Sequence, residues 1–135
     1  MMLLLPGCVP ATSFNLGLVP TPFGSVRFLF VHCEDAGVTG VSLTGSGTRA
    51  RPLWRIRTDE PSAASSFTVG STPLGFSEDV ALRRQLPPVR RLYAQVDTTS
   101  GRYAVGFRAL DLVPGMVRRT TDTVTKEAFA AGACG

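Results

Sequence analysis

Three cysteines, Cys8, Cys33 and Cys134, are the residues of this 135-residue chain that could do chemistry most directly. An odd number of cysteines in a small chain usually leaves one thiol without a disulfide partner. All three cysteines are accounted for if Cys33 and Cys134 form a disulfide and Cys8 carries a lipid anchor. Such a protein would lie outside the cytoplasm, because disulfides persist in oxidising compartments. The alternative is a cytosolic protein in which Cys33 and Cys134 are buried free thiols.

The residues before Cys8 are apolar and small, as at the end of a secretory signal. Leu5-Pro6-Gly7-Cys8 resembles the lipobox of bacterial lipoproteins, whose cysteine becomes the lipidated first residue. Residues 1–12 are therefore expected to be a signal remnant or a lipid-anchored tether, and residues 13–135 the folded domain. No basic residue precedes Arg27, so an earlier in-frame start is expected to supply the basic part of the signal. The alternative is a greasy tail with a free Cys8.

His32 is the only histidine, so a catalytic dyad or triad built on histidine must use it. Cys33 and the pair Glu34-Asp35 follow it, but adjacent strand residues point to opposite faces and the spacing of a zinc site is lacking. The acidic pair Glu78-Asp79 is interpreted as solvated. The sequence therefore predicts no enzyme, no metal site and no cofactor. A deep pocket around His32 with a carboxylate in reach would be the sign of an enzyme.

Arginine supplies thirteen of the fourteen basic residues, and the net charge is +4. Arg55 and Arg57 lie on the outward side of an alternating segment. Arg90 and Arg91 open the segment that contains Tyr93. Arginines interleaved with aromatic residues are typical of surfaces that bind nucleic acid or another polyanion. The same arginines are also compatible with a solvated face that attracts anionic surfaces in general.

Short strands are expected to hold these side chains in place. Ser25–Cys33 is apolar on both faces, which predicts a strand that is central or covered by another part of the chain. Pro52–Thr58 alternates, so Trp54 and Ile56 point inward. Asp59–Ser65 is predicted to be a polar loop because it is polar and contains a proline. The other predicted segments are Gly37–Leu43, Ser66–Gly70, Phe76–Leu82, a hairpin of Arg90–Asp97 with Arg102–Phe107, and a short strand within Leu110–Val117.

A helical pattern occurs only near the end, at Lys126–Ala131, with Thr125 as the predicted N-cap and Gly132 as the stop. A Cys33–Cys134 disulfide would pin this tail over the Leu29/Val31 face of the apolar strand Ser25–Cys33. The tail would then explain why that strand is apolar on both sides.

Seven or eight short strands separated by turn signals predict an all-β fold. Glycine (14) and proline (10) are spread in short clusters along the chain, which suits many turns better than long helices. We expect one domain, an immunoglobulin-like β-sandwich with a short C-terminal helix. A small barrel is the alternative architecture.

The chain also resembles the small secreted or lipid-anchored β-sandwich domain of unknown function found in high-GC Gram-positive bacteria. The resemblance rests on four segments: Leu53–Arg57, Val69-Gly70, Pro73–Phe76 and Tyr93–Val96. It implies a cysteine after the signal, one in an early strand and one at the C-terminus, which corresponds to Cys8, Cys33 and Cys134. No activity comes with this resemblance.

These features predict a non-enzymatic binding or structural module of the cell envelope. We expect an exported lipoprotein on the extracellular side of the cell membrane, anchored through Cys8, or a secreted protein if Cys8 is not lipidated. Its expected partners are the membrane and an envelope protein or polymer, and we expect a monomer. The alternative is a cytosolic basic β-domain with free thiols that binds nucleic acid or another polyanion with salt-dependent affinity; nucleic acid is the less favoured partner. The arginines assigned to that alternative are Arg55, Arg57, Arg90 and Arg91.

Overall fold

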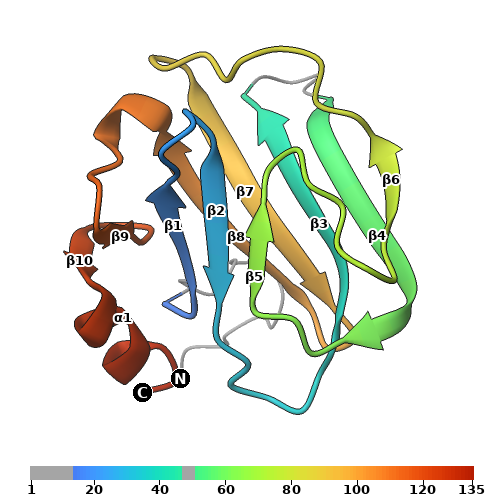
Figure 1. Ribbon diagram of the computed structural model, residues 1–135. Coiled ribbons are helices and arrows are strands. Elements are labelled where there is room, and N and C mark those ends of the chain that lie inside the picture. Colours follow the sequence, from blue (N-terminus) through green and yellow to red (C-terminus); the bar gives the residue numbers. More distant parts are fainter. Residues whose placement is uncertain (1–13, 47–50) are drawn as a thin grey trace, which may run out of the picture.

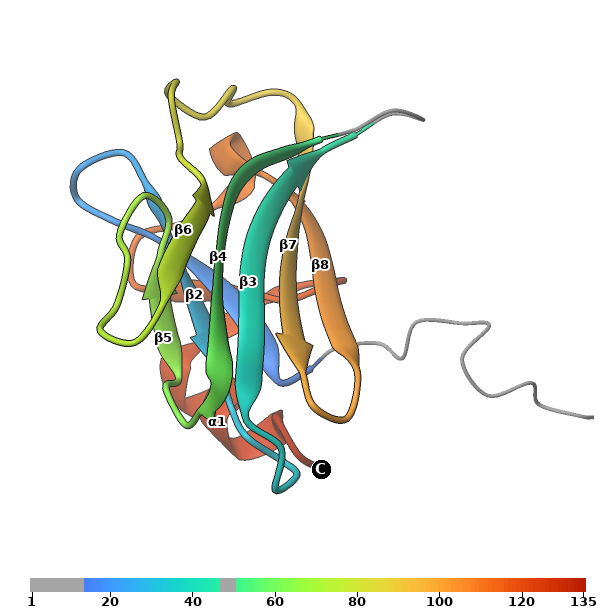
Figure 2. The ribbon, with the colours of Figure 1, turned by 90° about the vertical axis from the view of Figure 1, so that its right-hand side faces the viewer.

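The computed structural model describes residues 14–46 and 51–135 of the chain. Within these ranges the chain forms ten strands, one 3₁₀ turn and one α-helix. The strands make two five-stranded sheets, in which neighbouring strands run antiparallel, and the sheets pack face to face (Figure 1, Figure 2). The predicted all-β sandwich is confirmed, with ten described strands rather than seven or eight.

The two sheets have the strand orders β10-β9-β1-β2-β5 and β6-β4-β3-β7-β8. The first sheet consists of β1 (Leu16–Pro20), β2 (Val26–Phe30), β5 (Ser66–Thr68), β9 (Met116–Arg118) and β10 (Thr123–Thr125). The second consists of β3 (Val38–Gly45), β4 (Pro52–Ser62), β6 (Ser77–Val80), β7 (Arg91–Thr98) and β8 (Arg102–Arg108). The 3₁₀ turn η1 (Ala109–Asp111) follows β8, and the helix α1 (Lys126–Gly132) follows β10.

The main core lies between the two sheets, because alternate residues of each strand point to the same side. Its largest buried side chains come from both layers and include Phe28 and Phe67 of the first sheet and Trp54 and Phe107 of the second. The rings of Phe28 and Trp54 meet edge to face with their centroids 6.0 Å apart. Trp54 therefore has the inward position that the alternation of Pro52–Thr58 predicts.

The sequence analysis does not predict β1, because Gly17 and Pro20 weaken its strand pattern. The packing explains the glycine. A Cβ added at Gly17 would overlap a methyl group of Val117 and come within 2.9 Å of the Phe129 ring. β1 is therefore buried on both faces, by the main core on one side and by the C-terminal segment on the other.

The prediction of a polar loop at Asp59–Ser65 is wrong in its first part, because β4 continues to Ser62. Val38 of β3 pairs with Ser62 after an irregularity in the register. β6 pairs only with Arg55–Arg57. The last part of β4 is consequently a sheet edge, where Pro61 is tolerated although it has no N–H to donate.

The helix α1 lies beside β9 and β10 at one corner of the first sheet (Figure 1), and its Phe129 packs on the outer face of that sheet. Its predicted cap is confirmed, since the hydroxyl of Thr125 accepts a hydrogen bond from the Ala128 N–H at 3.1 Å. A second hydrophobic cluster lies beneath it, formed by Val19, Val117 and Phe129 with Leu29, Val31 and Val124 packed against them. The tail thus covers the predicted face of the apolar strand, which explains why that strand is apolar on both sides.

Candidate functional site

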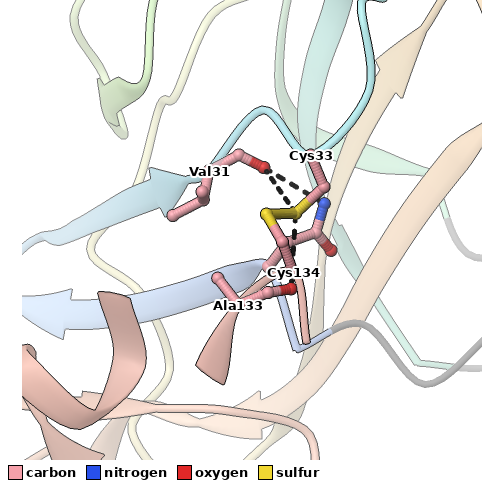
Figure 3. The surroundings of a disulfide bond; sticks show 5 residues. Val31, Cys33, Ala133 and Cys134 are labelled. Carbon is pink, nitrogen blue, oxygen red and sulfur yellow. Dashed lines mark hydrogen bonds between the residues drawn. A yellow bond between two sulfur atoms is a disulfide. The ribbon is translucent and has the colours of Figure 1, made fainter. Parts of the chain in front are cut away.

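The predicted disulfide between Cys33 and Cys134 is present (Figure 3). The two Cα atoms are 5.2 Å apart, and the bond spans 101 residues of sequence. The Cys33 sulfur lies 3.3 Å from the carbonyl oxygen of Ala133 and 3.7 Å from that of Val31. The bridge therefore ties the end of α1 to the segment after β2 and holds Phe129 over the first sheet. Cys8, the predicted lipidation site, lies outside the described residues.

Three of the four arginines of the predicted polyanion-binding face lie on the outer face of the second sheet. Arg55 and Arg57 of β4 flank Asp79 of the edge strand β6, with one guanidinium nitrogen of each 3.8 Å from the carboxylate. Arg91 opens β7, and its guanidinium carbon lies 5.9 Å from the centroid of the Tyr93 ring. The acidic pair containing Asp79, predicted to be solvated, therefore supplies a partner for two of these arginines.

Further arginine–aspartate pairs occur on the same strands and the adjoining turn. The Nε of Arg102 donates to Asp97 at 2.6 Å. Arg108 donates to both carboxylate oxygens of Asp111, at 3.0 and 3.2 Å. Together with Asp79, these aspartates offset most of the positive charge of the outer face.

Arg90 contributes to a different feature, a groove of about 410 Å³ that we call the upper groove. It lies where the connection between β6 and β7 passes the end of β3 and the start of β4. This is the end of the sandwich opposite to the C-terminus (Figure 1). The apolar floor of the groove includes Pro52, Leu53, Leu82, Leu86, Pro87 and Leu92. The side chains of Leu53, Leu82 and Leu86 also pack against the main core, so the floor is fixed by the fold.

Three exposed arginines, Arg83, Arg84 and Arg90, line the rim of the upper groove. Within residues 14–46 and 51–135 none of their side chains has an ion pair or a hydrogen bond. No described aspartate or glutamate lines the groove. The groove therefore combines an apolar floor with a positive rim that no side chain of the described residues neutralises.

A larger hollow, of about 470 Å³, lies along the end of β4 and the turn before β6. Charged side chains of both signs line it, among them Arg57, Asp59 and Glu60. Because Asp59 and Glu60 outnumber Arg57, the charge of this hollow does not favour an anionic ligand, in contrast to that of the upper groove.

His32 lies between β2 and β3, with both ring nitrogens close to backbone carbonyl oxygens. Its Nε2 is 2.8 Å from the oxygen of Ala64 and its Nδ1 is 3.3 Å from that of Ala36. Its ring stands edge-on to Phe30, with the centroids 4.9 Å apart. These contacts join the β2–β3 connection to the segment before β5, which is a structural role. In the described part of the chain no three His, Cys, Asp or Glu side chains are grouped to hold a metal ion.

Arg119 and Asp122 form an ion pair with shifted pKa values in the turn between β9 and β10. Arg119 donates two hydrogen bonds to the carboxylate of Asp122, at 2.6 and 2.8 Å. These hydrogen bonds lower the pKa of Asp122 and raise that of Arg119. The Arg119 guanidinium also stands 5.1 Å from the ring centroid of Phe14. Arg119 therefore contacts both the carboxylate of Asp122 and the ring of Phe14.

Comparison of the chain with protein-family models, with curated proteins and with solved structures finds no match. Among the described residues no helix has the length and apolar character needed to cross a bilayer. Of the described features, the upper groove unites a cavity of ligand size with charge that lacks a partner.

Arg83 and Arg84 are the residues of this site that the sequence analysis leaves out. Their signal is visible in the sequence, because the stretch from Val80 to Leu92 contains four arginines and no acidic residue. The floor of the groove has no comparable signal. Leu53 is 29 positions from Leu82 in the sequence, and only the fold brings them to one cavity.

Proposed function

We propose that this chain is a non-enzymatic binding domain that works outside the cytoplasm and binds an anionic partner at the upper groove. The observation that carries the proposal is the absence of acidic partners for Arg83, Arg84 and Arg90 within the described residues. Elsewhere on the second sheet the fold supplies aspartates to arginines. Arginine groups left free at a groove are available to an external anion.

Two physical effects favour anion binding at this place. The guanidinium group presents several N–H donors in a planar fork that matches carboxylate and phosphate oxygens. The apolar floor excludes water from one side of the site, and charge-assisted hydrogen bonds are stronger where water is excluded. An isolated arginine on a flat surface has only the first of these advantages.

The location outside the cytoplasm is supported by the Cys33–Cys134 disulfide, because such bonds persist where the environment is oxidising. A lipid anchor at Cys8 and a role at the cell envelope belong to the same proposal. The partner that fits this location is an anionic component of the envelope.

Titration with a short polyphosphate tests the proposal. The rim variant Arg83→Ser/Arg84→Ser/Arg90→Ser and the face variant Arg55→Ser/Arg57→Ser/Arg102→Ser each remove three positive charges. We expect the rim variant to bind at least about tenfold more weakly than the natural chain, because charge-assisted hydrogen bonds are lost. The face variant is expected to stay within about twofold, since its arginines already have partners. Equal losses in both variants would show that net charge alone governs binding and would overturn the proposal.

The second candidate function is polyanion or nucleic-acid binding through Arg55, Arg57, Arg90 and Arg91 together. The stacking of Arg91 on Tyr93 favours it. The pairing of Arg55 and Arg57 with one aspartate weighs against it. A larger loss in the face variant than in the rim variant would favour this second candidate.

A further inference from the structure

We infer that the ligand of the upper groove is a single aliphatic chain with an anionic head group, a carboxylate or a phosphate. The inference rests on the proposed anion binding at this groove and adds the chemical class of the ligand. Its two supports are independent features of the groove: the leucine floor and the arginine rim.

The floor is the first support. Leu53, Leu82 and Leu86 are only partly buried, and each lines the groove while packing against the main core. Their exposed surface is therefore held in place as an outward extension of the core. A fully hydrophilic anion, such as inorganic phosphate, would leave this apolar surface in contact with water. An aliphatic chain on the floor gains the hydrophobic free energy of covering it.

The distribution of charge is the second support. Among the described residues, the charged groups that line the groove are arginines at its exposed rim, whereas the floor is hydrocarbon. A ligand complementary to this arrangement has its negative charge at one end only. The cavity volume of about 410 Å³ falls within the range of small-molecule sites. We therefore assign the groove to a free, single-chain amphiphile rather than to the surface of a bilayer.

A chain-length series tests the inference directly. The full-length protein is titrated with inorganic phosphate and with hexyl, octyl and decyl phosphate, each kept monomeric in solution. Burial of one methylene is worth about 0.8 kcal/mol, so each added methylene should tighten binding by about three- to fourfold while it reaches the floor. Decanol, which lacks the anion, is expected to bind at least about tenfold more weakly than decyl phosphate. Equal affinity for inorganic phosphate and decyl phosphate would overturn the inference.

Two variants separate the floor from the rim. In Leu86→Gln we expect polyphosphate binding to be kept. The ratio of the affinity for decyl phosphate to that for hexyl phosphate is expected to fall by at least about threefold. In Arg84→Ser we expect weaker binding of all the phosphates with the chain-length dependence kept. Leu110→Gln is the matched control, because Leu110 is an exposed leucine that does not line the groove. A Leu53→Gln variant repeats the floor test if Leu86→Gln does not fold.

The outcomes distinguish this inference from the function on which it depends. If polyphosphate binds through the rim but longer alkyl chains add no affinity, the ligand class is wrong and anion binding stands. If neither polyphosphate nor decyl phosphate binds, both are wrong. If vesicles containing anionic phospholipid bind but monomeric decyl phosphate does not, the groove is a membrane-docking surface and the inference is overturned.

Discussion

The outer face of the second sheet and the upper groove are both rich in arginine, but their arginines have different neighbours. On the face, Arg55 and Arg57 share Asp79, and Arg102 is bound to Asp97 at 2.6 Å. The three rim arginines of the groove have no such partner within the described residues. The density of arginine in a sequence is therefore a poor guide to which arginines an external anion can reach. Whether the fold brings an acidic residue within reach decides whether an arginine is available.

The neighbouring strand β6 shows how local this effect is. Asp79 lies within 3.8 Å of two arginines, whereas the adjacent Glu78 makes no ion pair in the described chain. Arg90 and Arg91 differ in the same way, because one lines the groove and the next lies over Tyr93. Arg90 lies in the bend before β7 and Arg91 is the first residue of that strand, so the two side chains have different neighbours.

The largest effect is expected at the Cys33–Cys134 bridge, at the end of the sandwich opposite to the upper groove. The variant Cys33→Ser/Cys134→Ser should lower the free energy of unfolding by about 4–5 kcal/mol, as the chain-entropy model gives for a loop of about 100 residues. Denaturant titration measures this loss. Polyphosphate binding by the folded fraction should be unchanged, because the groove lies at the opposite end. A loss of binding in proportion to the loss of stability would show that the groove depends on the bridge.

An intermediate effect is expected when the face is made to resemble the rim. Asp79→Asn frees Arg55 and Arg57, so the affinity for polyphosphate should rise by about two- to fivefold, and Arg55→Ser/Arg57→Ser should abolish that gain. Glu78→Gln is the matched control, since it removes the same charge from the same strand without freeing an arginine. An equal rise in Glu78→Gln would mean that only the net charge matters.

The smallest effect concerns the most tightly held arginine. Because hydrogen bonds from Arg119 lower the pKa of Asp122 below its usual 3.8, the pair stabilises the fold above about pH 4, and this contribution disappears as the pH falls through the lowered pKa. Asp122→Asn should therefore have a slightly lower melting temperature than the natural chain at pH 7. The two melting temperatures should be equal at a pH below both the usual pKa and the lowered pKa of Asp122. A constant difference at all pH values would contradict this assignment. Polyphosphate binding should be the same in both chains at pH 7.

Much of the fold could be predicted because it depends on local sequence patterns and on the number of cysteines. The alternation of Pro52–Thr58 placed Trp54 inside, and the cysteine count together with the apolar strand Ser25–Cys33 led to the Cys33–Cys134 bridge. β1 could not be predicted in the same way. Gly17 breaks the strand pattern for a tertiary reason, the close approach of Val117 and Phe129.

The candidate site was less predictable than the fold. The sequence shows the basic stretch around Arg83, Arg84 and Arg90, but it does not show which arginines meet an aspartate. That depends on which strands are neighbours and in what register, as when β6 pairs with Arg55–Arg57 and brings Asp79 to them. The groove floor requires segments distant in sequence to meet, which follows from packing rather than from local pattern.

An NMR titration that follows the arginine Nε–Hε signals while polyphosphate is added separates the rim arginines from those of the face most directly. We expect the signals of Arg83, Arg84 and Arg90 to shift together, with one dissociation constant, while those of Arg55 and Arg57 stay within their starting line widths. Shifts of Arg55 and Arg57 equal to those of the rim, or a rim that does not respond, would contradict this expectation.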